Sequence, residues 1–282
     1  MTGHFRVVIL AAATCATGLY VPAHAAAQSA AHVRKTAADV VIRIQRADYE
    51  GDRAALQRLH DELTALAARS DDRHLTSRVR YWQGFALWRR ALNGFNDAAT
   101  PSELERDLQL AIGRFEQALE LDAAFVDSKL GIASCLGNMA ALHRRDQARV
   151  QGLLPRIIQL TKESQAASPE NPRLFWVRGP QLWWIPADKG GGRPAAVANY
   201  ERGLEFARKQ KGVKGDPLEP AWGEPELLMS LAWSHLNLAV PNPAAAEEYA
   251  KQALALVPHW RYVRDVLMPQ IRAVREKNRP RS

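Results

Sequence analysis

The segment with the most unusual chemistry is a run of three glycines between two basic residues, Lys189-Gly190-Gly191-Gly192-Arg193-Pro194. Glycines before a helix start can expose backbone N–H groups to an anion. The segment lacks the Gly-Lys-Ser/Thr ending of a nucleotide-binding P-loop. Two interpretations therefore stay open. One is an anion or partner contact at Lys189, Gly191, Gly192 and Arg193, and the other is a flexible connection between helices.

Aromatic residues supply a second candidate site. All eight tryptophans lie beyond residue 25, and several fall in predicted helices that face the inside of a helical array. An aromatic groove with occasional arginine suits an extended peptide or an amphipathic partner helix. The alternative is that these rings fill wide spaces between helices, since large aromatics dominate core burial. If Gly84 and Gly179 mark tight-packing positions, the inward residues are Tyr81, Trp88, Arg89, Trp176, Trp183, Trp184, Trp233 and Asn237.

Other kinds of reactive site have no signature in the sequence. No two of the eight histidines stand three or four residues apart, and Cys135 is the one cysteine outside the first 25 residues, so a zinc site has no local pattern. Neither a Gly-x-Ser-x-Gly elbow nor a Cys-Gly-type nucleophile motif occurs. We therefore predict no catalytic residue, no bound metal and no cofactor, and we expect that the protein is not an enzyme.

The elements that must position these residues are helices. Alanine, leucine, arginine, glutamine and glutamate dominate, while alternating β-branched runs are missing, so the fold class is all-α. Asp52 is expected to cap one helix, and Thr100 with Glu103 to form a capping box on another. Glycine, proline, asparagine and aspartate divide the chain into five hairpins and a last helix. The predicted pairs are 31–48 with 53–68, 75–92 with 101–121, 124–144 with 146–167, 172–185 with 194–209, and 225–240 with 243–257, followed by 259–277.

Three of the second helices repeat one spacing of small and large residues. Small residues let neighbouring helices approach, the larger one fills the groove, and proline ends the hairpin. A single amphipathic hairpin cannot bury both of its faces, so repetition predicts stacking. The residues are Ala111, Phe115, Ala118 and Ala123, then Ala246, Ala250, Ala253 and Pro258, and in part Ala196, Tyr200 and Gly203.

This spacing resembles the second helix of the tetratricopeptide repeat family, which carries small, aromatic, small and then proline. The segments Phe115–Phe125 and Glu247–Pro258 match it best, although Ala123 replaces the proline and Ala250 the aromatic residue. First-helix matches are looser, and several connections exceed the family's three-residue turn. The resemblance implies a right-handed α-solenoid of about five helix-turn-helix hairpins plus a C-terminal capping helix, with a partner on its concave face.

The first residues predict export. A basic start, a short apolar run and the sequence Ala23-His24-Ala25 describe a secretory signal peptide over residues 1–25. A lipid anchor at Cys15 is the alternative, although the residues before it fit lipoprotein cleavage poorly. We expect a helical repeat domain over 26–277, a basic tail over 278–282, and a periplasmic or secreted product.

Charge and hydropathy limit the partners. The net charge of +8 is spread over many arginines rather than gathered in one stripe, so no nucleic-acid partner is expected. No segment beyond the signal is apolar enough to span a membrane. The leading prediction is an exported scaffold that binds a protein or peptide in envelope assembly or maintenance. The alternative is a solute-binding or transport-accessory protein with an aromatic pocket for a small ligand; the sequence predicts no oligomeric state.

Overall fold

A computed structural model describes residues 23–68, 70–210 and 215–278. Most of the predicted signal peptide, including Cys15, and most of the predicted basic tail lie outside these ranges. The predicted domain boundaries therefore stay predictions. Among the described helices, none combines the length and the apolar composition that crossing a bilayer requires.

The described residues form helices and no strand, which confirms the predicted all-α fold class. The last predicted helix is not α-helical throughout. Its first part is a π-helical turn over Tyr262–Leu267, which runs directly into an α-helix. A short 3₁₀ turn, Ala187–Lys189, lies within the glycine-rich connection. The α-helices are α1 (Ala23–Glu50), α2 (Arg53–Ala67), α3 (Arg73–Asn96), α4 (Pro101–Leu121), α5 (Val126–Leu142), α6 (Gln147–Ala167), α7 (Pro172–Trp184), α8 (Arg193–Gln210), α9 (Glu224–Leu236), α10 (Pro243–Leu256) and α11 (Met268–Lys277).

Two of the helices begin at the N-cap residues that the sequence predicts, Asp52 and Thr100. The Asp52 side chain accepts a hydrogen bond from the Ala55 N–H at 2.8 Å, which satisfies one free amide of α2. Thr100 caps α4 by accepting from the Glu103 N–H at 3.3 Å. The predicted capping box is only half formed, because the Glu103 carboxylate accepts from Arg53 Nη2 instead, at 2.5 Å.

Glycines and aromatic rings set the distance between neighbouring helices. The buried ring of Phe115 on α4 lies against Gly84 of α3 and Gly131 of α5, where an added Cβ would come within 2.9 Å and 2.6 Å of ring atoms. Tyr200 on α8 lies against Gly179 of α7 in the same way, where an added Cβ would be 2.0 Å from the ring. The residues with the repeated spacing are therefore those that pack helices closely.

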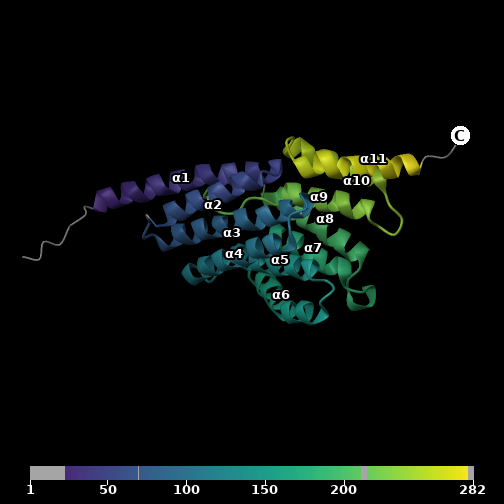
Figure 1. Cartoon of the computed structure of the whole chain (residues 1–282), viewed down its shortest axis with the longest axis horizontal. Coiled ribbons are helices and arrows are strands. Elements are labelled where there is room, and N and C mark those ends of the chain that lie inside the picture. Colours follow the sequence, from purple (N-terminus) through teal and green to yellow (C-terminus); the bar gives the residue numbers. More distant parts are fainter. Residues whose placement is uncertain (1–22, 69, 211–214, 279–282) are drawn as a thin grey trace, which may run out of the picture.

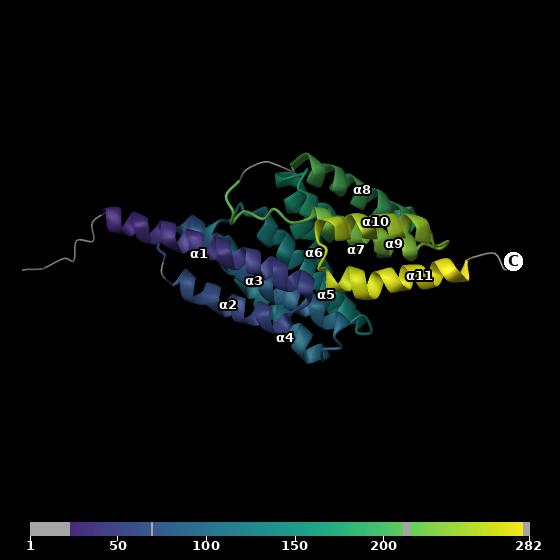
Figure 2. The ribbon, with the colours of Figure 1, turned by 90° about the horizontal axis from the view of Figure 1, so that it is seen from above.

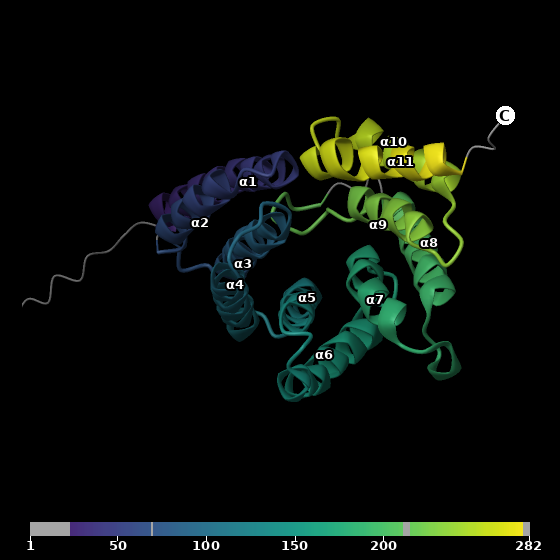
Figure 3. The ribbon, with the colours of Figure 1, turned by 45° about the vertical axis from the view of Figure 1, so that its right-hand side comes forward.

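Successive helices pair as antiparallel hairpins that stack along a curved path (Figure 1). Each helix contacts the next in sequence, and α1, α3, α5, α7 and α9 also contact one another in succession. The path curves until the C-terminal end of α1 lies close to the segment that connects α10 to α11 (Figure 3). There, Tyr49 contacts Trp260 edge to face with ring centroids 5.0 Å apart. The right-handed solenoid form and the tetratricopeptide resemblance stay predictions.

Candidate functional site

Residues 215–223, the described part of the connection between α8 and α9, extend away from these two helices toward α3 (Figure 2). We call residues 215–223 the inner loop. Trp82 Nε1 on α3 donates a hydrogen bond to the Leu218 carbonyl at 2.8 Å, and Trp222 Nε1 donates to the Tyr81 hydroxyl at 2.9 Å. Leu218 and Trp222 are both buried. Through Leu218 and Trp222 the inner loop is therefore packed into the core, while residues 215, 217 and 221 remain exposed.

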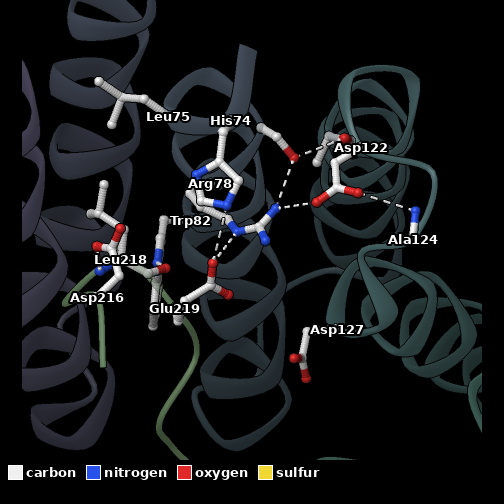
Figure 4. Close-up of polar contacts among 12 residues, drawn as sticks. His74, Leu75, Arg78, Trp82, Asp122, Ala124, Asp127, Asp216, Leu218 and Glu219 are labelled. Atoms are coloured by element: carbon white, nitrogen blue, oxygen red, sulfur yellow. Dashed lines mark hydrogen bonds and ion pairs between the residues drawn. The ribbon is translucent and has the colours of Figure 1, made fainter. Parts of the chain in front are cut away.

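Ion pairs hold the inner loop at its edge. Figure 4 shows Arg78 of α3 between Glu219 of the inner loop and Asp122 at the end of α4, with distances of 2.6 Å to each carboxylate. The hydrogen bond from Arg78 lowers the pKa of the Asp122 carboxyl. On α7, Arg173 Nη1 donates to the Trp222 carbonyl at 3.2 Å. Helices from two hairpins, α3 and α7, thus hold the inner loop.

The inner loop changes the interpretation of three predicted partner-binding residues. Tyr81, Trp88 and Arg89 do lie on the inside, but all three are buried, and no open groove exists beside them. Arg89 Nε donates to the Asp48 carboxylate at 2.7 Å, so its charge is satisfied within the protein. For these three residues the structure corrects the predicted groove, because Trp222 of the inner loop packs against Tyr81 and Trp88, and Arg89 is enclosed by its carboxylate partners.

The remaining predicted tryptophans gather around one pocket. It lies between α7 and α9, has a volume of about 230 Å³, and is open to solvent. The sequence did not single out its other residues, although Tyr200 carries the repeated spacing. We call this site the tryptophan pocket, and it is lined by Trp176, Pro180, Trp183 and Trp184 of α7, Tyr200 of α8, and Met229, Ser230 and Trp233 of α9.

The walls of the tryptophan pocket differ in how firmly they are held. Trp183 and Trp233 contact each other with ring centroids 5.0 Å apart. Trp176 contacts the buried Trp88 and Trp222, at 5.5 Å and 5.4 Å, so the inner wall is anchored to the core. Trp184 is instead 80% exposed. The arrangement offers flat apolar surfaces, three of them fixed and one free to adjust.

Arg193 and Asn237 lie beside the tryptophan pocket and are not part of its lining. Arg193, the first residue of α8, has its Cζ atom 5.5 Å from the centroid of the Trp183 ring. Its Nη1 donates to the Asn237 carbonyl at 2.9 Å. Asn237 is the C-cap residue of α9, and its side-chain amide donates to the Trp233 carbonyl at 2.8 Å. Asn237 therefore joins the two helix ends instead of lining the pocket.

The glycine-rich connection uses its backbone amides internally. Gly191 N–H donates to the Pro186 carbonyl at 3.1 Å and Gly192 N–H to the Leu182 carbonyl at 2.8 Å. An added Cβ at Gly191 would lie 2.4 Å from the Ile185 carbonyl oxygen. These glycines permit a tight turn. Because their N–H groups already donate to carbonyls of the chain, the predicted anion contact at the backbone of Gly191 and Gly192 is not formed. The exposed side chains of Lys189 and Arg193 are what remains of that predicted contact.

Other candidate sites are less defined. Within the described ranges, no group of three or more His, Cys, Asp or Glu side chains is arranged to hold a metal ion. Cys135 is fully buried, and burial raises the pKa of its thiol.

A second cavity, of about 520 Å³, lies between α8 and α10, and the sequence does not predict it. It is lined by Glu201, Leu204, Glu205, Arg208, Ala245, Glu248, Tyr249 and Gln252.

Fold and pocket together define a class, an all-helical protein of antiparallel helical hairpins with an aromatic pocket between α7 and α9. Among solved structures, the HusA haemophore from Porphyromonas gingivalis has a similar fold, with a TM-score of 0.57. The match covers 74% of this chain and 96% of that chain at 18% sequence identity, and so shows the fold alone. No protein-family model matches the chain, and no curated protein matches it in sequence.

Proposed function

We propose that this protein is an exported binding protein that takes a flat, apolar ligand in the tryptophan pocket. The observation that carries the proposal is the convergence of Trp176, Trp183, Trp184 and Trp233 on one cavity open to solvent. Aromatic walls favour planar ligands, because rings stack on rings and release ordered water from both faces. No catalytic step is part of this proposal.

Two further observations support a small ligand over an extended peptide. The inside of the array beside α3 is filled by the inner loop, so a long peptide has no continuous path there. One protein of similar fold is a haemophore, and haem is a planar and largely apolar molecule. The ligand class that we propose for this chain includes such macrocycles and other fused aromatic rings.

A second candidate function keeps the same surface but replaces the small molecule with a protein partner. At the tryptophan pocket, Trp184 and the residue that follows it, Ile185, are exposed, and neighbouring exposed apolar residues are typical of interaction sites. An apolar side chain of the partner would then enter the pocket. This is the envelope scaffold that the tetratricopeptide resemblance implies, with the contact moved from α3 to α7 and α9.

Titration with N-phenyl-1-naphthylamine, a neutral aromatic probe that fluoresces in apolar surroundings, tests the proposed function. The wild-type protein should bind it in a saturable way. Trp184→Ala removes an exposed wall and should weaken binding roughly tenfold, since burying one large apolar side chain contributes about 1.5–3 kcal/mol. Met229→Trp, which fills the pocket, should abolish binding.

The matched control is Leu110→Ala on α4, which also removes an exposed large apolar side chain but lies on a helix that contributes nothing to the pocket. Its affinity for the probe should equal that of the wild type. Unaltered affinity in both Trp184→Ala and Met229→Trp would show that the probe binds elsewhere, and the proposed function would be wrong.

A further inference from the structure

We infer that the ligand of the tryptophan pocket carries an anionic group, and that the guanidinium of Arg193 binds this group at the edge of the pocket. The inference rests on the proposed function, because it concerns the same pocket, and it narrows the ligand from any flat apolar molecule to an aromatic acid.

Arg193 is held beside the pocket by the backbone before it and by its own side-chain hydrogen bond to the Asn237 carbonyl. The hydrogen bond from Gly192 N–H to the Leu182 carbonyl, at 2.8 Å, fixes the residue before it against the end of α7. The guanidinium then lies over Trp183, with Cζ 5.5 Å from the ring centroid, in the range of a cation–π contact. Trp183 itself lines the pocket. A ligand that stacks in the pocket therefore has a cation close to its edge.

The charge of Arg193 has no counter-charge within the part of the chain that the structure describes. Its hydrogen bond goes to a backbone carbonyl, that of Asn237. By contrast, the buried arginines Arg78, Arg89 and Arg173 all pair with carboxylates. A guanidinium carries five N–H donors, so Arg193 keeps donors for a carboxylate, sulfonate or phosphate of a ligand.

The neighbouring charges leave a small positive excess at this place. Lys189, on the same connection, is exposed and also forms no ion pair with a described residue, whereas Asp188 beside it opposes its charge. None of the residues that line the pocket carries a charged side chain, and the polar groups among them are the indole N–H groups and the hydroxyls of Ser230 and Tyr200. Burial raises the pKa of the Tyr200 hydroxyl, so this group stays neutral. An anionic group of the ligand thus finds its best partner at Arg193, outside the apolar walls.

A matched pair of probes tests the inference. N-phenyl-1-naphthylamine and 1-anilinonaphthalene-8-sulfonate share one aromatic body, and the second adds a sulfonate. The wild-type protein should bind the sulfonate about tenfold more tightly, because the guanidinium forms a charge-assisted hydrogen bond with it. Arg193→Gln should remove this advantage and leave the affinity for the neutral probe unchanged. Arg193→Lys should keep part of it.

The control variant is Arg202→Gln. Arg202 is another exposed arginine of α8 that lies over an aromatic ring, with Cζ 5.6 Å from the Phe206 centroid, and neither residue lines the pocket. This variant should bind both probes like the wild type. Higher ionic strength should reduce the sulfonate advantage in the wild type and not in Arg193→Gln.

The outcomes separate the inference from the function on which it rests. If the wild type binds both probes with equal affinity, or if Arg193→Gln weakens both equally, the inference is wrong and the proposed function stands. If neither probe binds the wild type, the proposed function fails and the inference fails with it. An equal loss of the sulfonate advantage in Arg202→Gln would also overturn it, because general surface charge would then explain the effect.

Discussion

The indole N–H of Trp222 donates a hydrogen bond to the hydroxyl of Tyr81 at 2.9 Å, across a sequence separation of 141 residues. Trp222 belongs to the inner loop and Tyr81 to α3, so the bond joins the second hairpin to the connection that precedes the fifth. Both rings are buried. The hairpins are therefore held together from inside by a segment that belongs to none of them.

Removing this contact should destabilise the whole protein. Trp222→Ala leaves a cavity among Phe85, Trp88 and Trp176 and should lower the free energy of unfolding by about 3–5 kcal/mol. Tyr81→Phe keeps the ring but leaves the indole N–H without its acceptor, at a cost of about 1–3 kcal/mol. Urea unfolding followed by circular dichroism measures both. A Trp222→Ala variant as stable as the wild type would mean that the inner loop is not part of the core.

Two glycine substitutions should change stability in opposite directions. Gly179→Ala forces a Cβ into the Tyr200 ring, and overpacking of this kind costs about 1–3 kcal/mol. Since Tyr200 lines the tryptophan pocket, probe binding should weaken as well. Gly152→Ala, at an exposed position of α6 with open space around it, should stabilise the protein by about 0.5–1 kcal/mol. Thermal unfolding measures the stability of both variants. A midpoint temperature that shifts in the same direction in both would contradict the close packing of α7 on α8.

Acid should weaken the ion pair at Asp122. The hydrogen bond from Arg78 holds the pKa of this carboxyl below its ordinary value, so the folded state favours the charged form. The pair therefore stabilises the protein above the unfolded pKa of about 3.9, and this contribution disappears as the pH falls through the folded pKa. The stability difference between wild type and Asp122→Asn should be constant near neutral pH and shrink in acid. A difference that grows in acid would refute this assignment.

The thiol of Cys135 should be unreactive in the folded protein. It is fully buried in α5, and burial raises its pKa, so both access and thiolate are lacking. In a chain with Cys15→Ser, a disulfide reagent such as Ellman's reagent should detect no thiol under native conditions and one equivalent after unfolding in urea. Rapid reaction without denaturant would show that α5 opens readily.

The features that the sequence predicts well are those set by neighbouring residues. Asp52 and Thr100 cap helices because a short side chain reaches an amide two or three residues on, which sequence spacing alone determines. Gly179 and Tyr200 pack together because both lie at repeating positions of paired helices. The same periodicity brings four predicted tryptophans to one pocket, although their role in binding stays a prediction.

The features that the sequence does not predict depend on contacts between residues far apart in the chain. Nothing local marks Leu218 and Trp222 as core residues, since they lie in a connection without helical periodicity. The burial of Trp222 explains why Tyr81 and Trp88 line no groove, whereas Arg89 is buried through its ion pair with Asp48. The glycine-rich connection was open to two interpretations, because only the folded chain shows that Gly192 donates to Leu182. The π-helical turn over Tyr262–Leu267 likewise has no simple sequence signal.

The most direct test of the central claim is the nuclear magnetic resonance spectrum of the tryptophan indole N–H groups during titration with N-phenyl-1-naphthylamine. The chain has eight tryptophans, so each indole reports on its own surroundings. The signals of Trp183, Trp184 and Trp233 should shift with one binding curve, while those of Trp82 and Trp260, which do not line the pocket, should stay in place. Shifts confined to other tryptophans, or none at saturating probe, would contradict ligand binding in the tryptophan pocket.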